Sequence, residues 1–483
     1  MTGNRDSYRR ILYATAVMGG ATVVAIVVGI IRTKIFALAI GPAGIGLIGL
    51  LTSIMATAAA IGSMGLGLSG VRAIAAAERD RALIRKALWL AVWPLAILTA
   101  LILWFGRNEI ARLVTDSTDQ ALGVGLMGIA AALTIIAGAQ VAVIQGVGNV
   151  GGVARARVWG AILSLLIGVP AVLYAGPIGL VVAVAAIPLG NVIAALPYRP
   201  KSEPTGRSGG ARLRGELWRL VTLGSVFMLV TSLGSAVLVI VRTLLIRDGG
   251  LETAGLYQAA YAISALNASL VLSAMATDYF PRLSGSHADR PGSAALVNQQ
   301  LHAALLLASP VLLAMAALAP LVLNLLYSPA FGAAAGLLRW QLVGEVLKLP
   351  GWALSFLLLA RADKGRFLFV ESAFAVAYVV LAALLLRAFG LTGVGIAYAA
   401  AYLIYSLLLA VICSRWHAAT LSRENGVHIA LVGAALVALA LIGEGAPWVA
   451  GAAGIVAAAA AAAYAWRHLS EIRRAEIPAP ESG

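Results

Sequence analysis

The sequence predicts an all-α, polytopic membrane protein, and three observations lead to this fold class. Hydrophobic residues make up 61% of the 483 residues and charged residues only 11%, which is too few to cover the surface of a soluble protein. Apolar stretches long enough to cross a bilayer core of about 30 Å recur from Ile11 to Trp466. Runs such as 311–319 and 455–463 are apolar at every position, which favours helices over alternating strands.

Hydropathy predicts about 14 transmembrane helices, starting near residues 11, 44, 84, 121, 153, 177, 216, 252, 296, 334, 366, 391, 427 and 446. With loops assigned alternately to two sides, 26 of the 35 Lys and Arg residues fall on the N-terminal side, four on the other and five inside spans. Positive residues collect in cytoplasmic loops, so both termini are expected in the cytoplasm. The net charge of +15 therefore belongs to loops, and nucleic acid is not an expected partner.

A linker rich in basic residues, Pro and Gly divides the chain into two lobes. The expected parts are an N-lobe of six helices (1–198), a basic cytoplasmic linker (199–215), a C-lobe of six helices (216–414), an extra helix pair (415–470) and a cytoplasmic tail (471–483). The lobes are expected to be pseudo-symmetric, because short matches recur at a nearly constant offset. The matches pair 31–33 with 241–243, 43–45 with 254–256, and Gly176 and Gly179 with Gly390 and Gly393. Parallel repeats of this kind are typical of transporters that work by alternating access.

Arg32 and Arg242 occupy the same repeat position, in the first and seventh predicted spans. A charge inside a span costs a few kcal/mol without a partner or water, so both are expected to face a cavity. The alternative is snorkelling of each side chain to the outer headgroups. Lys34, two residues after Arg32, points elsewhere on the helix and fits snorkelling better.

The tenth predicted span carries a polar stripe of Gln341, Glu345, Lys348 and Trp352, which share one helix face. This stripe is expected to line the interior as a substrate-contacting or coupling site. The alternative is a Glu345–Lys348 pair that only holds helices together. Two further candidates for the cavity are less central: Arg339 lies off the stripe, and Asp278 lies near the cytoplasmic end of its span.

Enzyme chemistry finds little support in the sequence. The five histidines show no spacing to each other or to acids that predicts a ligand set or a catalytic base, so no metal site is expected. The predicted outer loops are too short for a catalytic domain. Cys413 is the only cysteine and ends an apolar run, which indicates packing.

Three segments resemble a known family: 29–34 leading to 41–47, then 65–72, and 340–348, which holds the buried Gln, Glu and Lys. They are similar to the oligosaccharide flippases of the O-antigen and lipid III translocase family, within the multidrug/oligosaccharidyl-lipid/polysaccharide exporter superfamily. The resemblance covers roughly residues 8 to 414, and the extra helix pair lies outside it. It implies the two-lobed fold of the multidrug and toxin extrusion (MATE) transporters.

The resemblance also implies a function. The expected activity is flipping of an undecaprenyl-pyrophosphate-linked oligosaccharide across the bacterial inner membrane, from the cytoplasmic to the periplasmic leaflet, for O-antigen-type polysaccharide biosynthesis. Arg32 and Arg242 would hold the pyrophosphate, whose oxygens match the guanidinium fork. No cofactor is implied. Coupling to H⁺, Na⁺ or the membrane potential is left open, as is a partnership with polysaccharide polymerase or chain-length machinery.

Three alternatives remain open at this stage. A drug/cation antiporter of the same fold typically needs a membrane-embedded acid in its first lobe, and the predicted first-lobe spans contain none. A peptidoglycan-precursor (lipid II) flippase is separated from an oligosaccharide flippase only by the three segments that resemble the family. A scaffold for a polymer-assembly complex would tolerate replacement of the buried polar residues.

Overall fold

The computed structural model describes residues 2–77, 80–200, 210–285 and 290–476, and these residues form helices and no strands. They divide into two compact units, Met1–Gly255 and Leu256–Gly483. Unit 1 holds α1 (Thr2–Gly62), α2 (Leu66–Ala76), α3 (Arg81–Phe105), α4 (Arg107–Thr115), α5 (Ala121–Gly146), α6 (Val150–Tyr174), α7 (Gly176–Ala195), a 3₁₀ turn (Leu196–Tyr198) and the first half of α8 (Gly210–Gly285). Unit 2 holds the rest of α8, then α9 (Arg290–Ala317), α10 (Ala319–Leu326), a 3₁₀ turn (Pro329–Ala334), α11 (Ala335–Ala360), α12 (Lys364–His417), α13 (Arg423–Gly445) and α14 (Pro447–Glu476).

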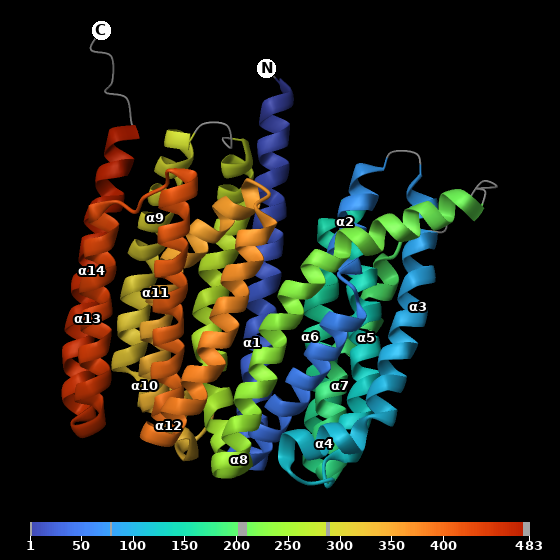
Figure 1. The fold of residues 1–483 in the computed structure, drawn as a ribbon, viewed down its shortest axis with the longest axis horizontal. Helices are drawn as coiled ribbons and strands as arrows, with labels where there is room; N and C mark the ends of the chain where they lie inside the picture. Colours follow the sequence, from blue (N-terminus) through green and yellow to red (C-terminus); the bar gives the residue numbers. More distant parts are fainter. Residues whose placement is uncertain (1, 78–79, 201–209, 286–289, 477–483) are drawn as a thin grey trace. The chain divides into compact units, whose positions relative to one another are not determined.

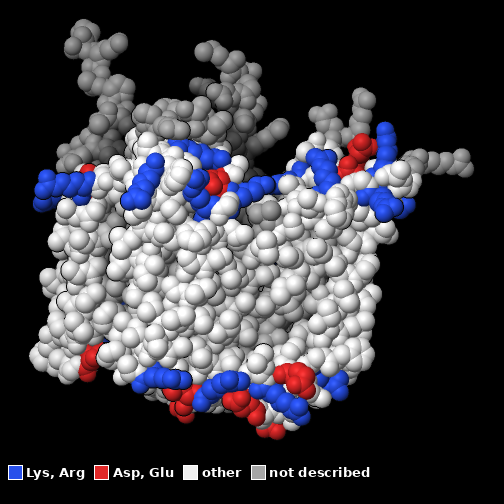
Figure 2. All heavy atoms as spheres, viewed as in Figure 1, with Lys and Arg blue, Asp and Glu red and all other residues white. Residues whose placement is uncertain are grey.

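Eleven helices of the described part are long and apolar enough to cross a membrane. Three of these apolar stretches, in α1, α8 and α12, run for 46, 40 and 54 residues. A straight helix of the longest would measure about 80 Å, far more than a bilayer core of about 30 Å. On the visible face of each unit, charged side chains lie near the helix ends and the surface between them is uncharged (Figure 2). The chain is therefore a multi-pass, all-helical membrane protein.

Glycines interrupt the three long helices. Gly41 in α1 (φ 62°, ψ −168°), Gly250 in α8 (φ 73°, ψ −172°) and Gly390 in α12 (φ 57°, ψ −145°) leave helical geometry for a left-handed φ that a side chain would oppose. Figure 1 shows α1 descending in dark blue and returning in lighter blue. Spans were expected to begin near residues 44, 252 and 391, just after these glycines. The predicted breaks thus agree with the structure, while the total of about 14 crossings stays a prediction.

The same glycines support the internal repeat. Gly41 and Gly250 are 209 residues apart and share nearly the same φ and ψ. Gly176 and Gly390, predicted to correspond, have the same φ of 57°. Gly179 and Gly393 lie three residues after these two glycines. A Cβ atom at either position would clash with the backbone carbonyl oxygen of the residue eight positions earlier. The two stretches therefore turn and pack in the same local geometry.

The structural units differ in extent from the predicted lobes. The first half of α8 packs within unit 1: Gly224 lies against Gly65, Gly255 against Gly46, and Arg247 forms an ion pair with Asp116 at 3.1 Å. This places Arg242 in the same unit as Arg32. Residues 201–209 of the predicted linker and 477–483 of the predicted tail lie outside the described residues. The predicted lobe boundaries remain a prediction about the repeat.

Helices α13 and α14, predicted to lie outside the repeat, form a hairpin that turns at Ala446. Helix α14 packs chiefly on α9, and α13 packs on α9, α11 and α14. An extra helix pair was expected at 415–470, and α14 extends to Glu476, six residues into the predicted tail. The pair is thus an integral part of the packing of unit 2.

A polar cluster ties the two ends of α12 together where α11 ends. The Asp363 carboxylate caps α12 by accepting from the backbone N–H of Arg366, and it also accepts from the Arg366 guanidinium. Its Oδ2 lies 3.2 Å from His417 Nε2 at the other end of α12. Arg361 Nη1 donates to the carbonyl oxygen of His417 at 3.0 Å. The cluster stabilises this helix-connecting region.

Replacing Asp363 by alanine should therefore lower the free energy of unfolding by about 1–2 kcal/mol, the usual effect of losing an N-cap. Burial raises the pKa of Asp363, but hydrogen bonds and charge from Arg366 and the bond to His417 together lower it more, so the net pKa is depressed. Stability from such a carboxyl is present above its unfolded-state pKa and is lost as pH falls through the folded-state value. Thermal unfolding in detergent should show a larger wild-type advantage near pH 7 than near pH 3, whereas an equal difference at both values would contradict this.

Candidate functional site

The first candidate group is cationic and belongs to unit 1. Arg32 lies on α1, nine residues before Gly41, or about 13 Å along the helix. Its Nη1 donates to the Ser164 hydroxyl on α6 at 2.9 Å, and that hydroxyl donates to the carbonyl oxygen of Ala161 at 2.8 Å. Arg32 Nε is buried and has no hydrogen-bond partner among the described residues. The guanidinium is thus held by α6 while one donor remains available.

Arg242 lies on α8, eight residues before Gly250, one residue closer to its glycine than Arg32 is to Gly41. Its side chain is only 4% exposed, and it is the one charged side chain buried in the described part of unit 1. A snorkelling arginine keeps its head group in water or among headgroups, so burial argues against that alternative for Arg242. Lys34 and Arg32 are both partly buried.

The second candidate group lies in unit 2 and contains the predicted stripe on α11. Gln341, Glu345 and Lys348 are all buried, with at most 7% exposure, and Trp352 is partly buried. Lys348 Nζ lies 3.5 Å from Glu345 Oε1. These residues are therefore buried within unit 2, and their role in lining a transport cavity stays a prediction. The Glu345–Lys348 pair exists, as the alternative reading also expected.

Glu345 is held by helices other than its own. Its Oε1 accepts from the Tyr398 hydroxyl on α12 at 2.6 Å and from the Ser264 hydroxyl on α8 at 2.9 Å. Lys348 Nζ also donates to the Tyr398 hydroxyl at 3.4 Å. A buried pair needs such extra hydrogen bonds to offset the loss of hydration. The carboxylate thus joins α8, α11 and α12 at one point.

Aromatic rings enclose the ammonium group of Lys348. Its Nζ lies 4.2 Å from the ring centre of Trp352 and 5.0 Å from that of Tyr402, within cation–π range. Further rings continue from this point within unit 2. They are Phe374, Tyr378, Tyr398 and Tyr405, linked through ring contacts of 4.4 to 6.0 Å, and the stacked pair Tyr257 and Tyr261, where the Tyr257 hydroxyl lies 3.2 Å from that of Tyr378. The Tyr405 hydroxyl donates to Glu371 at 2.8 Å.

Gln341 is fully buried, and neither its amide oxygen nor its amide nitrogen has a hydrogen-bond partner among the described residues. Unsatisfied buried polar atoms cost about 1–3 kcal/mol each and call for an explanation. One turn from Glu345 on the same helix face, this amide marks a position suited to a polar group of a ligand.

The structure does not bring Arg339 to the stripe. Its Nε donates to the carbonyl oxygen of Ala316 on α9 at 3.1 Å, and its Nη1 donates to that of Gly443 on α13 at 3.0 Å. The prediction that Arg339 belongs to the cavity site needs correction, because the side chain turns to the carbonyl groups at two helix ends. Its contacts fasten α13 to the rest of unit 2. The side chain of Asp278, the other peripheral candidate, lies outside the described residues.

Sequence reasoning missed the tyrosines of α12 and Ser264. Tyr398, Tyr402 and Tyr405 recur at spacings of four and three, which places them on one helix face. That periodicity was a usable signal. The position of Ser264 opposite Glu345 could not be read from either helix alone.

Comparisons with known proteins give a family match and several solved structures of the same fold. A family model described as "Polysaccharide biosynthesis protein" matches residues 35–335. A comparison with curated protein sequences gives no match.

Three solved structures share the fold. One is a lipid II flippase MurJ in an inward closed conformation, with a TM-score of 0.68, 12% identity and coverage of 94% of this chain and 99% of that chain. The second is an inward-facing multidrug resistance MATE family transporter of the MOP superfamily, with a TM-score of 0.66, 17% identity and coverage of 84% and 95%. The third is a MOP superfamily transporter from Pyrococcus furiosus whose title reports reversed polarity of its binding pocket, with a TM-score of 0.61, 16% identity and coverage of 87% and 96%. At sequence identities of 12–17%, the structural similarity shows that the chains share a fold and shows nothing further.

Proposed function

Because the chain belongs to the polysaccharide biosynthesis protein family and has the fold of MOP superfamily transporters, we propose that it flips an undecaprenyl-pyrophosphate-linked oligosaccharide. The movement would run from the cytoplasmic to the periplasmic leaflet of a bacterial inner membrane. Alternating access of the two lobes would expose the site to each side in turn.

The sign of the buried charge in unit 1 carries the proposal. Its one buried charged side chain in the described part is Arg242, and Arg32 lies in the equivalent repeat position. The acids within the apolar stretches of unit 1, Asp248 and Glu252, are exposed beside the turn at Gly250. A cationic interior of this kind suits an anionic substrate.

Pyrophosphate fits these side chains by charge and by shape. A guanidinium offers a planar fork of donors to two phosphate oxygens and stays charged when buried. The Ser164 hydroxyl fixes one Nη of Arg32, which lowers the entropy lost when the remaining donors bind the anion. The sugars would need no charge. The polyprenyl tail can remain in the bilayer.

The two rival transport functions rest on weaker grounds. A lipid II flippase shares the fold at 12% identity, which is too low to carry over its substrate. A multidrug resistance MATE family transporter shares the fold at 17% identity, but the buried charge of unit 1 has the wrong sign for a drug/cation antiporter. The family match to polysaccharide biosynthesis favours the oligosaccharide.

Complementation tests the proposed function. The chain should restore outer-leaflet glycan in a bacterium that lacks its own oligosaccharide flippase, and it should not rescue depletion of the lipid II flippase. Export of cationic drugs from the same cells should stay at the vector level. Rescue of lipid II transport alone, or drug export without glycan, would overturn the assignment in favour of one rival.

Orientation is a separate prediction, based on the basic loops. In intact spheroplasts, a membrane-impermeant maleimide should label Thr118→Cys, between α4 and α5, and should label Thr420→Cys, between α12 and α13, only after permeabilisation. Both positions are exposed, and Cys413 is fully buried, so the wild-type chain is the unlabelled control. The reverse labelling pattern would mean that the termini lie outside.

A further inference from the structure

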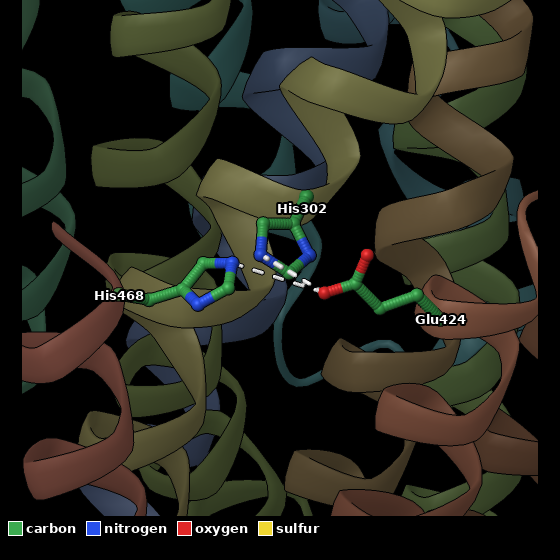
Figure 3. Close-up of side chains that lie close together, drawn as sticks. All are labelled: His302, Glu424 and His468. Carbon is green, nitrogen blue, oxygen red and sulfur yellow. Dashed lines mark ion pairs between the residues drawn. The ribbon is translucent and has the colours of Figure 1, made fainter. Parts of the chain in front are cut away.

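Two histidines and a glutamate from three helices converge in unit 2 (Figure 3). His302 comes from α9, Glu424 from the first turn of α13 and His468 from the last part of α14. Glu424 Oε1 lies 3.8 Å from the Nε2 atom of each histidine, and one ligand atom from each residue lies within 4.8 Å of the others. The expectation that the histidines form no constellation with acids is wrong here, because helix packing joins residues 122 and 44 positions apart.

The hydrogen bonds around His302 fix which ring nitrogen is available. Its Nδ1 lies 3.1 Å from the amide oxygen of Asn425. The orientation of that amide is set from its other side, because its nitrogen donates to the backbone oxygen of Asn298 at 2.9 Å. The amide oxygen can only accept, so His302 Nδ1 carries the hydrogen and Nε2 presents its lone pair. Nε2 is buried, has no hydrogen-bond partner among the described residues and faces Glu424.

This is the arrangement of a metal-binding histidine. Such a ring donates from one nitrogen to an oxygen of the protein and binds the ion with the other. Asn425 is 1% exposed and therefore rigidly placed to orient the ring. The ring of His468 lies 4.9 Å from that of His302 and stacks on Tyr464 at 5.6 Å.

We propose that His302, Glu424 and His468 bind one divalent transition-metal ion of the zinc class. Two imidazole nitrogens and one carboxylate oxygen suit Zn²⁺ and its neighbours, whereas Ca²⁺ and Mg²⁺ prefer oxygen ligands alone. Bonds of about 2.0–2.2 Å place tetrahedral ligands about 3.3–3.6 Å apart, so the side chains must close by less than about 1.5 Å. Glu424 and His468 are 59% and 33% exposed, which leaves room for water as a fourth ligand.

The ion would act on the extra helix pair. Helices α13 and α14 are joined at one end by the turn at Ala446, and the three ligands lie at the other end, where α13 begins and α14 finishes. A bound metal would close this open end and tie both helices to α9. Helix α9 belongs to the repeat, so the ion would limit independent movement of the pair.

Metal binding to the full-length protein in detergent tests the proposal, with purification through a tag that contains no histidine. Metal-stripped wild type should bind one Zn²⁺ per chain, and bound Co²⁺ should show the visible absorption of a four-coordinate site. His302→Ala, His468→Ala and Glu424→Gln should each weaken Zn²⁺ binding at least about tenfold, since each removes a ligand. Glu444→Gln, an exposed acid at the far end of α13, should bind like wild type.

Thermal unfolding supplies a second readout. An ion that binds only the folded state raises the melting temperature, and Zn²⁺ should do so for wild type and Glu444→Gln but not for the three ligand variants. Absence of stoichiometric Zn²⁺ binding to wild type would overturn the proposal. Undiminished affinity in the ligand variants would do the same. These measurements involve no transported substrate, so their outcome is independent of the proposed flippase activity.

Discussion

Replacing Arg242 by alanine should lower the rate of oligosaccharide flipping about 10- to 100-fold at matched membrane expression. A hydrogen bond to a charged group contributes about 1.5–3 kcal/mol, and each 1.4 kcal/mol is a factor of ten. Arg242 is the one buried charged side chain in the described part of unit 1, so its loss leaves no second buried charge there. Arg242→Lys should retain part of the activity, because it keeps the charge but loses the planar fork. Outer-leaflet glycan in the complementation strain is the readout.

Arg247→Ala is the matched control for this prediction. Arg247 lies five residues further along α8, is 43% exposed and pairs with the exposed Asp116. Exposed pairs contribute at most about 1 kcal/mol, so flipping should stay close to wild type. Arg32→Ala should resemble Arg242→Ala, and Ser164→Ala should have a smaller effect because it only loosens the Arg32 side chain. Equal activity of Arg242→Ala and Arg247→Ala would show that the buried cation plays no part in transport.

Breaking the Glu345–Lys348 pair should produce the second large effect. Removing one partner leaves a buried charge without its counterion, which typically costs about 3–5 kcal/mol. Glu345→Leu and Lys348→Met should therefore each lower the melting temperature in detergent and the amount of folded protein in the membrane. Glu109→Gln, which removes a 79% exposed acid from α4, should be neutral.

The double variant Glu345→Gln, Lys348→Met separates structural from functional roles of the pair. Replacing both charges leaves no buried ion without its partner, unlike each single variant. Replacing a whole buried ion pair by uncharged residues is often close to neutral for stability. We expect the double variant to regain folding but not flipping, because Glu345 is the one buried acid of the described residues and ionisable groups inside membranes usually serve transport. Recovery of both would mean that the pair only holds α8, α11 and α12 together.

Much of the fold could be predicted because the membrane restricts the choices. Helices follow from the apolar composition, and the reversals at Gly41, Gly250 and Gly390 follow from where hydropathy places the span boundaries. The repeat could be predicted because a positive φ favours glycine. Both Gly176 and Gly390 have such a φ, so the sequence keeps a glycine at each of these corresponding positions.

The candidate sites were less predictable because side-chain direction depends on neighbouring helices. The stripe on α11 was predicted from spacing alone, since its members share one helix. The direction of the Arg339 side chain depends on its hydrogen bonds to backbone carbonyl groups near the C-terminal ends of α9 and α13. The His302, Glu424 and His468 cluster depends on packing among three helices, and no short spacing in the sequence indicates it.

Transbilayer movement in reconstituted vesicles tests the central claim most directly. Liposomes containing the purified protein and a polyprenyl-pyrophosphate-linked oligosaccharide would be treated with a membrane-impermeant glycosidase, which cleaves only outward-facing glycan. Wild-type vesicles should lose nearly all the glycan over time, whereas protein-free and Arg242→Ala vesicles should keep the inner half protected. Persistent protection of the inner half with wild-type protein, together with uptake of a cationic drug by the same vesicles, would contradict the flippase assignment.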